Sequence, residues 1–273
     1  MAKNEEKIKV KIKRLKEYFK KTPEVLMAFV FGSYAKNMAG EESDFDIAIY
    51  LKEKEKENKI WSKISRIVEK EVDLVCLNEA PASLISNIFK TGIALSIKDK
   101  RLYWEFYLRA SSEAEDFLAF SRDFWAIYER SNSLIPEDET RLLQRIHFLH
   151  SELKEIDDFK ELTSKDYKED KTKRRIIERW VENICNATLD IAKIILASEK
   201  KKMPKTYEQV LCDFGVLAGL MDIETEKFSR FASLRNLLAH EYLDILYEKI
   251  QNFLNEAPEI YKKIFFFLEK YSK

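Results

Sequence analysis

The chain has 273 residues, which is enough for one large domain or two ordinary ones. Lys plus Arg and Asp plus Glu both number 48, so the formal net charge is zero and excludes a general attraction for polyanions. Any contact with nucleic acid must therefore come from a local patch of charge. We expect no signal peptide, because Lys and Glu alternate near the N-terminus, and no apolar run reaches the roughly 20 residues of a membrane span. The three cysteines lie far apart in apolar runs and predict reduced core thiols in a cytoplasmic protein: Cys76, Cys185 and Cys212.

The first hundred residues alternate helical and strand patterns, which is typical of a small α/β domain with three or four strands. The strand that starts near Asp44 should turn Phe45, Ile47, Ile49 and Leu51 to one face. In chain order we expect a helix over 4–20, strands over 25–31 and 44–51, a helix over 57–70, a strand over 72–77, a helix over 81–89 and a strand over 93–97.

From residue 101 the pattern becomes helical throughout. Residues 101–130 carry aromatic side chains at helical spacing, which predicts a packing surface. Ser131–Ser133 and Pro136 are the best candidate boundary before a bundle of roughly four to six antiparallel helices. Within the bundle we expect helices over about 137–159 and 169–199, a shorter one after Pro204, another capped by Asp222, and a last one that Pro258 interrupts.

Three acids and a glycine turn make up the most informative part of the N-terminal half. Gly32-Ser33 ends a buried strand, Asp44 and Asp46 share one face of the next strand, and Asp73 lies on a further strand. Two carboxylates so close repel each other unless a cation lies between them, and a divalent cation is the usual answer. A glycine lets the backbone approach a triphosphate, and the serine hydroxyl with local N–H groups can bind its oxygens.

This combination predicts phosphoryl transfer on a nucleotide. Asp44 and Asp46 would hold two Mg²⁺ ions, and Asp73 would act as a third metal ligand or as a base near the attacking hydroxyl. A single aspartate at a strand edge more often only keeps the sheet soluble. Three on successive strands behind a Gly-Ser turn are too much like charge for that explanation alone.

The same residues resemble the polymerase-β-type nucleotidyltransferase superfamily and, within it, the minimal nucleotidyltransferase (MNT) family. That family's pattern of a Gly-Ser turn, Asp-x-Asp and a later lone Asp is matched by the five residues just named. The resemblance covers about residues 1–110 and implies ATP as substrate with Mg²⁺. One departure is Asn37, where the family often has glycine; asparagine tolerates positive φ.

A second informative stretch runs from Leu234 to Tyr242. On one ideal helix Arg235, Asn236, His240 and Tyr242 share a polar face, opposite an apolar arc that contains Phe231 and Leu234. Small residues on the polar face, Ala232 and Ala239, would leave room for a ligand or a partner helix. Arginine binds phosphate and histidine can transfer a proton near neutral pH, which suits cleavage of a phosphodiester. Because Arg235 and His240 are about 140° apart, a symmetric dimer would present them better than one helix.

The Arg–polar–x–x–x–His pattern resembles the HEPN family, whose members are often ribonucleases. The resemblance implies an RNA-cutting homodimer with Arg235, Asn236 and His240 in its site. It also implies a toxin–antitoxin pair in which an MNT partner silences the HEPN toxin by transferring AMP from ATP to the motif's tyrosine, here Tyr242. Donor site and acceptor would then lie on one polypeptide.

We therefore expect an α+β chain: a small mixed-sheet nucleotidyltransferase domain over 1–110, a helical connector over 111–135 and an all-α HEPN bundle over 136–273. Two alternatives stay open. The first is a small-molecule nucleotidyltransferase, because the chain more distantly resembles the kanamycin nucleotidyltransferase type, which also joins this catalytic fold to a helical domain. The second is a bundle that only dimerises or binds RNA without cutting it.

Overall fold

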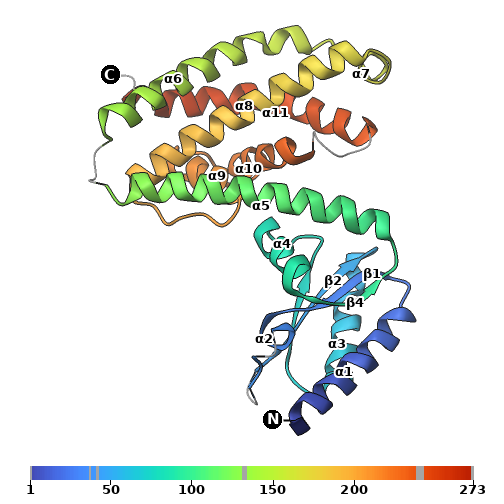
Figure 1. The fold of residues 1–273 in the computed structure, drawn as a ribbon. Coiled ribbons are helices and arrows are strands. Elements are labelled where there is room, and N and C mark those ends of the chain that lie inside the picture. The colour runs from blue at the N-terminus through green and yellow to red at the C-terminus, as the bar shows by residue number, and fades with distance from the viewer. Residues whose placement is uncertain (1, 37, 41–42, 131–133, 238–242, 272–273) are drawn as a thin grey trace. The chain divides into compact units, whose positions relative to one another are not determined.

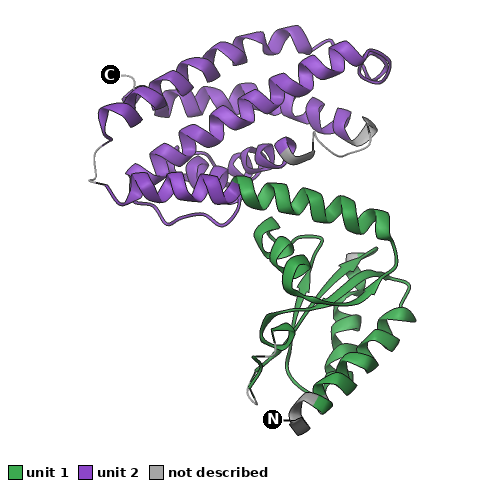
Figure 2. Ribbon diagram, in the orientation of Figure 1, with its two compact units in different colours: residues 1–116 green, residues 117–273 purple. Residues whose placement is uncertain are grey.

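The computed structural model describes residues 2–36, 38–40, 43–130, 134–237 and 243–271. The chain divides into two compact units, Met1–Asp116 and Phe117–Lys273 (Figure 2). The division falls inside one long helix, α5 (Lys100–Tyr128). Each unit has its own apolar core and is described separately below.

Unit 1 is built on a four-stranded mixed sheet (Figure 1). Its strands are β1 (Val25–Val30), β2 (Phe45–Leu51), β3 (Val72–Cys76) and β4 (Ile93–Ile97), in the order β3-β2-β1-β4. β1 pairs antiparallel with both β2 and β4, whereas β2 and β3 run parallel. The parallel pair requires a crossover, which α3 (Glu57–Val68) supplies.

Both faces of this sheet are covered, and the alternation along β2 shows how. Phe45, Ile47, Ile49 and Leu51 belong to one buried cluster, while Ala48 belongs to the other, as the period of two predicts. α1 (Ala2–Lys20) and α3 pack on the first face (Figure 1). α4 (Ala82–Thr91) and the first turns of α5 pack on the second. The expected elements of this half are thus confirmed.

In the part of unit 2 that the structure describes, the α-helices are the end of α5 from Phe117 on, α6 (Pro136–Leu153), the short α7 (Ser164–Glu169), α8 (Lys171–Ser198), α9 (Tyr207–Leu217), α10 (Asp222–Leu237) and α11 (Leu243–Leu268). α8 forms the centre of the unit, because every residue from Ile191 to Ala197 is buried. A helix segment that is buried on all sides needs neighbours on all sides, and α5, α6, α9, α10 and α11 contribute to the same core.

Three expectations were wrong, and two of them concern this half. Pro258 does not interrupt the last helix: α11 continues through it, because buried residues on both sides of the proline, Leu254 and Tyr261 among them, keep the helix packed despite one lost backbone bond. Asp222 is the first residue of α10 and not its cap. The backbone N–H of Met221, just before the helix, instead donates a hydrogen bond to the Glu224 carboxylate at 3.1 Å. Of the three cysteines only Cys185 is buried, whereas Cys76 and Cys212 are partly exposed.

Candidate functional site

Two of the three predicted acids are direct neighbours across a pair of strands. In the parallel pairing of β2 with β3, Asp46 is the register partner of Asp73. Asp44 lies just before β2, two residues from Asp46. The β2–β3 register therefore brings a carboxylate from each strand to the same end of the sheet, next to the place where β1 ends.

The Gly-Ser turn lies against the central acid of this group. Gly32 has a φ of +67° and begins the four-residue helix α2 (Gly32–Ala35) directly after β1. A Cβ added at Gly32 would lie 2.7 Å from Cγ of Asp46 and closer still to one of its oxygens, so only glycine fits. The backbone N–H of Ser33 donates to the Asp46 carboxylate. The turn and the acid are thus parts of one local structure.

The surroundings of Asp46 disfavour the ionised form of its carboxyl group. Burial, followed by the negative charges of Asp73 and Asp44, raises the pKa of the Asp46 carboxyl above its usual value. The backbone N–H groups of Asp46 and Ser33 oppose that rise but do not cancel it. Concentrated negative charge of this kind is relieved either by a proton or by a cation.

The donor set suits a hard divalent cation, since carboxylate oxygens are the ligands that Mg²⁺ prefers. In the residues that the structure describes, no three acidic, histidine or cysteine side chains already surround a common point as metal ligands would. Asp44 and Asp73 are exposed, and rotation of their side chains toward Asp46 would complete a set. The fit therefore rests on the chemistry of the donors and on the unneutralised charge at Asp46.

The second predicted site is described only in part. Arg235 lies in the last turn of α10, and its guanidinium stands 5.1 Å from the centre of the Tyr207 ring. Asn236 belongs to the same helix, but its side chain is outside the described part of the structure. His240 and Tyr242 fall outside the described residues, as does the helical continuation expected over 238–242.

One expectation about this helix was wrong. Ala232, predicted to leave room on the polar face, is 1% exposed and belongs to the core of unit 2. The buried stripe of α10 is wider than the leucine pattern indicated, because α8, α9 and α11 all contribute to the core beside it. Phe231 and Leu234 are buried as expected.

Sequence reasoning missed the residues that support both sites. Tyr207, whose ring faces Arg235, lies 28 positions earlier at the start of α9, and nothing in the sequence connects the two. Tyr34 and Lys70 contact the carbonyl of Ser43, next to Asp44. Tyr34 follows the Gly-Ser turn closely enough that the turn itself could have drawn attention to it.

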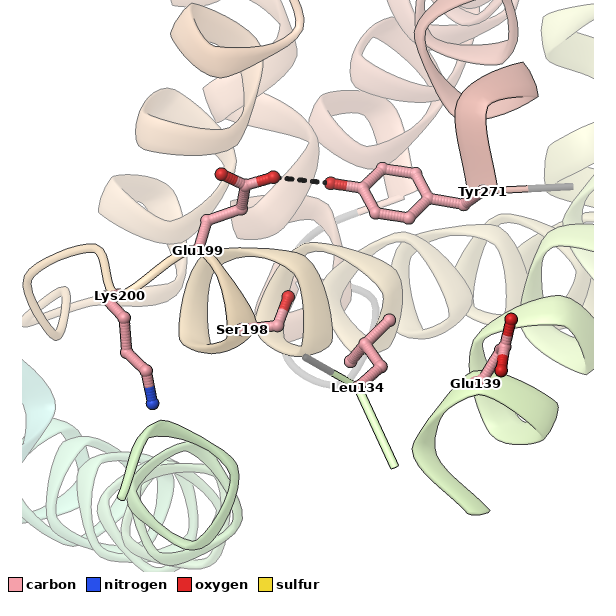
Figure 3. A pocket seen from close by; sticks show the side chains of 6 residues that line it. All are labelled: Leu134, Glu139, Ser198, Glu199, Lys200 and Tyr271. Atoms are coloured by element: carbon pink, nitrogen blue, oxygen red, sulfur yellow. Dashed lines mark hydrogen bonds between the residues drawn. The ribbon is translucent and has the colours of Figure 1, made fainter. Parts of the chain in front are cut away.

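A polar hollow of about 570 Å³ lies elsewhere in unit 2 (Figure 3). None of the predicted site residues lines it. Glu199 accepts a hydrogen bond from the Tyr271 hydroxyl at 3.0 Å, and the Lys200 ammonium donates to the backbone carbonyls of Tyr128 and Arg130. The protein thus supplies partners for the charged groups of Glu199 and Lys200 in this hollow. Among the described residues, no helix is long and apolar enough to cross a membrane.

Comparison with known families divides the chain in the same way as the two units. Residues 13–101 match the family described as polymerase beta, nucleotidyltransferase. Residues 149–264 match the family described as Ribonuclease HepT-like. The first match contains the Gly-Ser turn and all three acids; the second contains the stretch from Arg235 to Tyr242.

Similar solved structures include three toxin–antitoxin complexes. A toxin–antitoxin with AMP-PNP is 23% identical, covers 40% of this chain and 88% of that chain, and has a TM-score of 0.34. A tri-AMPylated Shewanella oneidensis HEPN toxin with its MNT antitoxin is 20% identical, with coverage of 40% and 90% and a TM-score of 0.32. The MntA–HepT complex is 22% identical, with coverage of 44% and 91% and a TM-score of 0.30. No curated protein matches the chain.

Proposed function

We propose that this chain, a polymerase-β-type nucleotidyltransferase domain followed by a HepT-like HEPN domain, transfers AMP from ATP to Tyr242 of its own helical half. The modification would silence a ribonuclease site that Arg235, Asn236 and His240 form in the same half. A toxin–antitoxin relation of the kind named for the similar complexes would then exist between two parts of one polypeptide.

The observation that carries the transferase half is the position of Asp46. Its carboxylate lies against the Gly32 turn and accepts a hydrogen bond from the Ser33 N–H. Asp46 is also the register partner of Asp73 in the pairing of β2 with β3. A turn that can bind phosphate oxygens and the acids that can hold their counter-ion are therefore contiguous. A sheet edge that only needed solubility would not require a half-buried carboxylate with a raised pKa.

Each residue has a role in this reaction. The Gly-Ser turn would bind the triphosphate through the Ser33 hydroxyl and through neighbouring backbone N–H groups, because the N–H of Ser33 itself donates to Asp46. Asp44, Asp46 and Asp73 would hold Mg²⁺, which when bound neutralises the charge of the phosphates. The Tyr242 phenol loses its proton to Asp73 or to solvent, its oxygen forms a bond to the α-phosphorus, and the bond to the β-phosphate breaks. Pyrophosphate leaves with that electron pair.

The ribonuclease half of the proposal rests on the family match and the chemistry of the motif. Arg235 would bind the scissile phosphate, and His240 would donate or accept the proton. In a homodimer with the two motif helices facing each other, Arg235 and His240 of both copies would line one shared groove for RNA. AMP on Tyr242 would add negative charge and bulk beside them, which opposes RNA binding.

The test is to incubate the full chain with ATP labelled at the α-phosphate and Mg²⁺, and to map the labelled residue by mass spectrometry. We expect label on Tyr242, loss of label in Asp46→Asn and in Tyr242→Phe, and no change in Glu17→Gln. The last variant removes an equal charge from an exposed position of α1. RNA cleavage should be high in Tyr242→Phe and should fall as wild-type protein becomes labelled.

Two results would contradict the proposal. Label that appears only on other residues, with Asp44 and Asp46 intact, removes Tyr242 as the acceptor. AMP found on an added aminoglycoside, with no labelled protein, establishes the small-molecule alternative instead. Loss of RNA cleavage in His240→Ala separates a nuclease from a bundle that only binds RNA or dimerises.

A further inference from the structure

The carbonyl oxygen of Ser43 accepts hydrogen bonds from two side chains that belong to different elements of unit 1. The Lys70 ammonium donates to it at 3.2 Å and the Tyr34 hydroxyl at 3.3 Å. A carbonyl oxygen has two lone pairs, so these two donors satisfy its hydrogen-bonding capacity. The next residue in the chain is Asp44.

Each donor is itself held in place. Tyr34 belongs to α2, is 5% exposed, and packs its ring 4.3 Å from that of Phe45. Lys70 follows Glu69, whose left-handed φ of 53° ends α3 and turns the chain toward β3. The Lys70 ammonium also stands 5.8 Å from the centre of the Tyr34 ring, within cation–π range. A residue beside the Gly-Ser turn and one beside β3 thus meet at one atom.

The backbone on both sides of Asp44 is fixed. On one side Ser43 is held through its carbonyl, and its hydroxyl accepts the N–H of Gly40 at 2.9 Å. On the other side the N–H of Phe45 donates to the Glu71 carbonyl at 3.0 Å. An exposed acid would otherwise sample many positions before the strand begins. Here its backbone is set relative to Asp46, two residues along.

We infer that Lys70 and Tyr34 are positioning residues of the nucleotidyltransferase site, which hold Asp44 where it can bind a divalent cation together with Asp46. This inference rests on the proposed transferase function of unit 1, and not on the identity of the acceptor. Neither residue needs to touch the nucleotide. Outer groups that orient a metal ligand affect metal affinity by about 10- to 100-fold when they are removed.

The measurement is the binding of Mn²⁺, a spectroscopic substitute for Mg²⁺, to the full chain saturated with a non-hydrolysable ATP analogue, by electron paramagnetic resonance. We expect Lys70→Met to weaken Mn²⁺ binding by about tenfold. Lys70→Arg, which keeps a donor and a cation, should restore most of the affinity. Tyr34→Phe should have a smaller effect, and the double variant should lose more than the sum of the two, because both donors share one acceptor.

The matched control is Lys63→Met, which removes the same group from an exposed position of α3. Affinity for the ATP analogue in EDTA should be equal in wild type, Lys63→Met and Lys70→Met. If Lys70→Met instead weakens analogue binding without metal and leaves Mn²⁺ affinity unchanged, Lys70 contacts phosphate and the inference is wrong. It is also wrong if Lys70→Met and Tyr34→Phe both behave as Lys63→Met does.

Different results would contradict the proposal that Tyr242 is the acceptor and the inference that Lys70 and Tyr34 position Asp44. A wild-type chain that binds Mn²⁺ and the analogue, yet places no AMP on Tyr242, contradicts the acceptor and leaves the positioning role intact. Transfer rates add a second check. For Lys70→Met, kcat should recover as Mg²⁺ is raised, because the lost property is metal affinity; recovery with raised ATP at fixed Mg²⁺ would contradict it.

Discussion

Gly32 and Asp46 are in such close contact that the glycine hydrogen occupies the place where any other residue would put its Cβ. The contact joins the end of β1 to the start of β2 and brings the Ser33 N–H to the carboxylate. Two residues 14 positions apart in the sequence therefore behave as one unit, and the conformation of the turn and the position of the acid depend on each other.

Gly32→Ala should lower the rate of nucleotidyl transfer by about 100-fold, because the new methyl group displaces the Asp46 carboxylate. Gly219→Ala is the matched control. Gly219 also has a positive φ, +82°, but a Cβ there meets no atom within 4 Å. Both variants should lose roughly 1–2 kcal/mol of stability through backbone strain alone. Urea unfolding and the labelled-ATP assay distinguish strain from collision; equal transfer by the two variants would rule out the collision.

Asp46→Asn should raise the melting temperature at neutral pH. The pKa of Asp46 is higher in the folded chain than in the unfolded chain, so between those two values the folded state binds more protons and stability falls as pH rises. The ionised carboxylate therefore destabilises the fold above its folded-state pKa, and this cost disappears below the unfolded-state value of about 3.9. Asparagine keeps an oxygen for the Ser33 N–H.

Thermal unfolding of wild type and Asp46→Asn at pH 3.5 and pH 7.5 checks this sign. The difference in melting temperature should be present at pH 7.5 and small at pH 3.5. Mg²⁺ with ATP should stabilise wild type at pH 7.5 and have less effect on the variant. A wild type that is more stable than Asp46→Asn at pH 7.5 without nucleotide or metal would contradict the raised pKa.

Lys193→Met should destabilise unit 2 by about 2 kcal/mol. The Lys193 ammonium is almost completely buried and lies 3.1 Å from Asp123 on α5 and 3.2 Å from Asp190. The loss should be less than that of an isolated buried pair, because both acids keep an arginine of α6 as partner, Arg141 and Arg145. Lys173→Met, which breaks an exposed bridge to Asp166, should have a much smaller effect, because water and salt screen an exposed pair. Urea midpoints measure both, and equal losses would contradict the prediction.

Tyr207→Leu should lower RNA cleavage by roughly two- to thirtyfold, the range that a cation–π contact with Arg235 supplies. Tyr207→Phe keeps the ring, and with it the T-shaped contacts to Phe117 and Phe120, so it should lose less cleavage than Tyr207→Leu. The assay uses the Tyr242→Phe background, which accepts no AMP. Equal cleavage by Tyr207→Leu and Tyr207→Phe would show that the ring does not hold the guanidinium.

The order and type of elements in unit 1 follow from local patterns, since strands of period two and helices of period 3.6 leave their signature within about ten residues. The alternation of β2 was therefore predictable residue by residue. Helix ends in unit 2 were less so. Whether α11 continues through Pro258 depends on the burial of Leu254 and Tyr261 against other helices, which no local rule contains.

The sequence by itself determined the chemistry: a Gly-Ser turn, three acids and an Arg–Asn–x–x–x–His–x–Tyr stretch, together with the α/β and all-helical halves that carry them. Only the tertiary structure decided which groups meet. The β2–β3 register made Asp46 and Asp73 neighbours, and the turn after α3 brought Lys70 to the Ser43 carbonyl. The packing of α9 beside α10 placed the Arg235 guanidinium over the Tyr207 ring. The reason is physical: residue types and local periodicity are written along the chain, whereas register, burial and charge repulsion arise only when distant segments pack together.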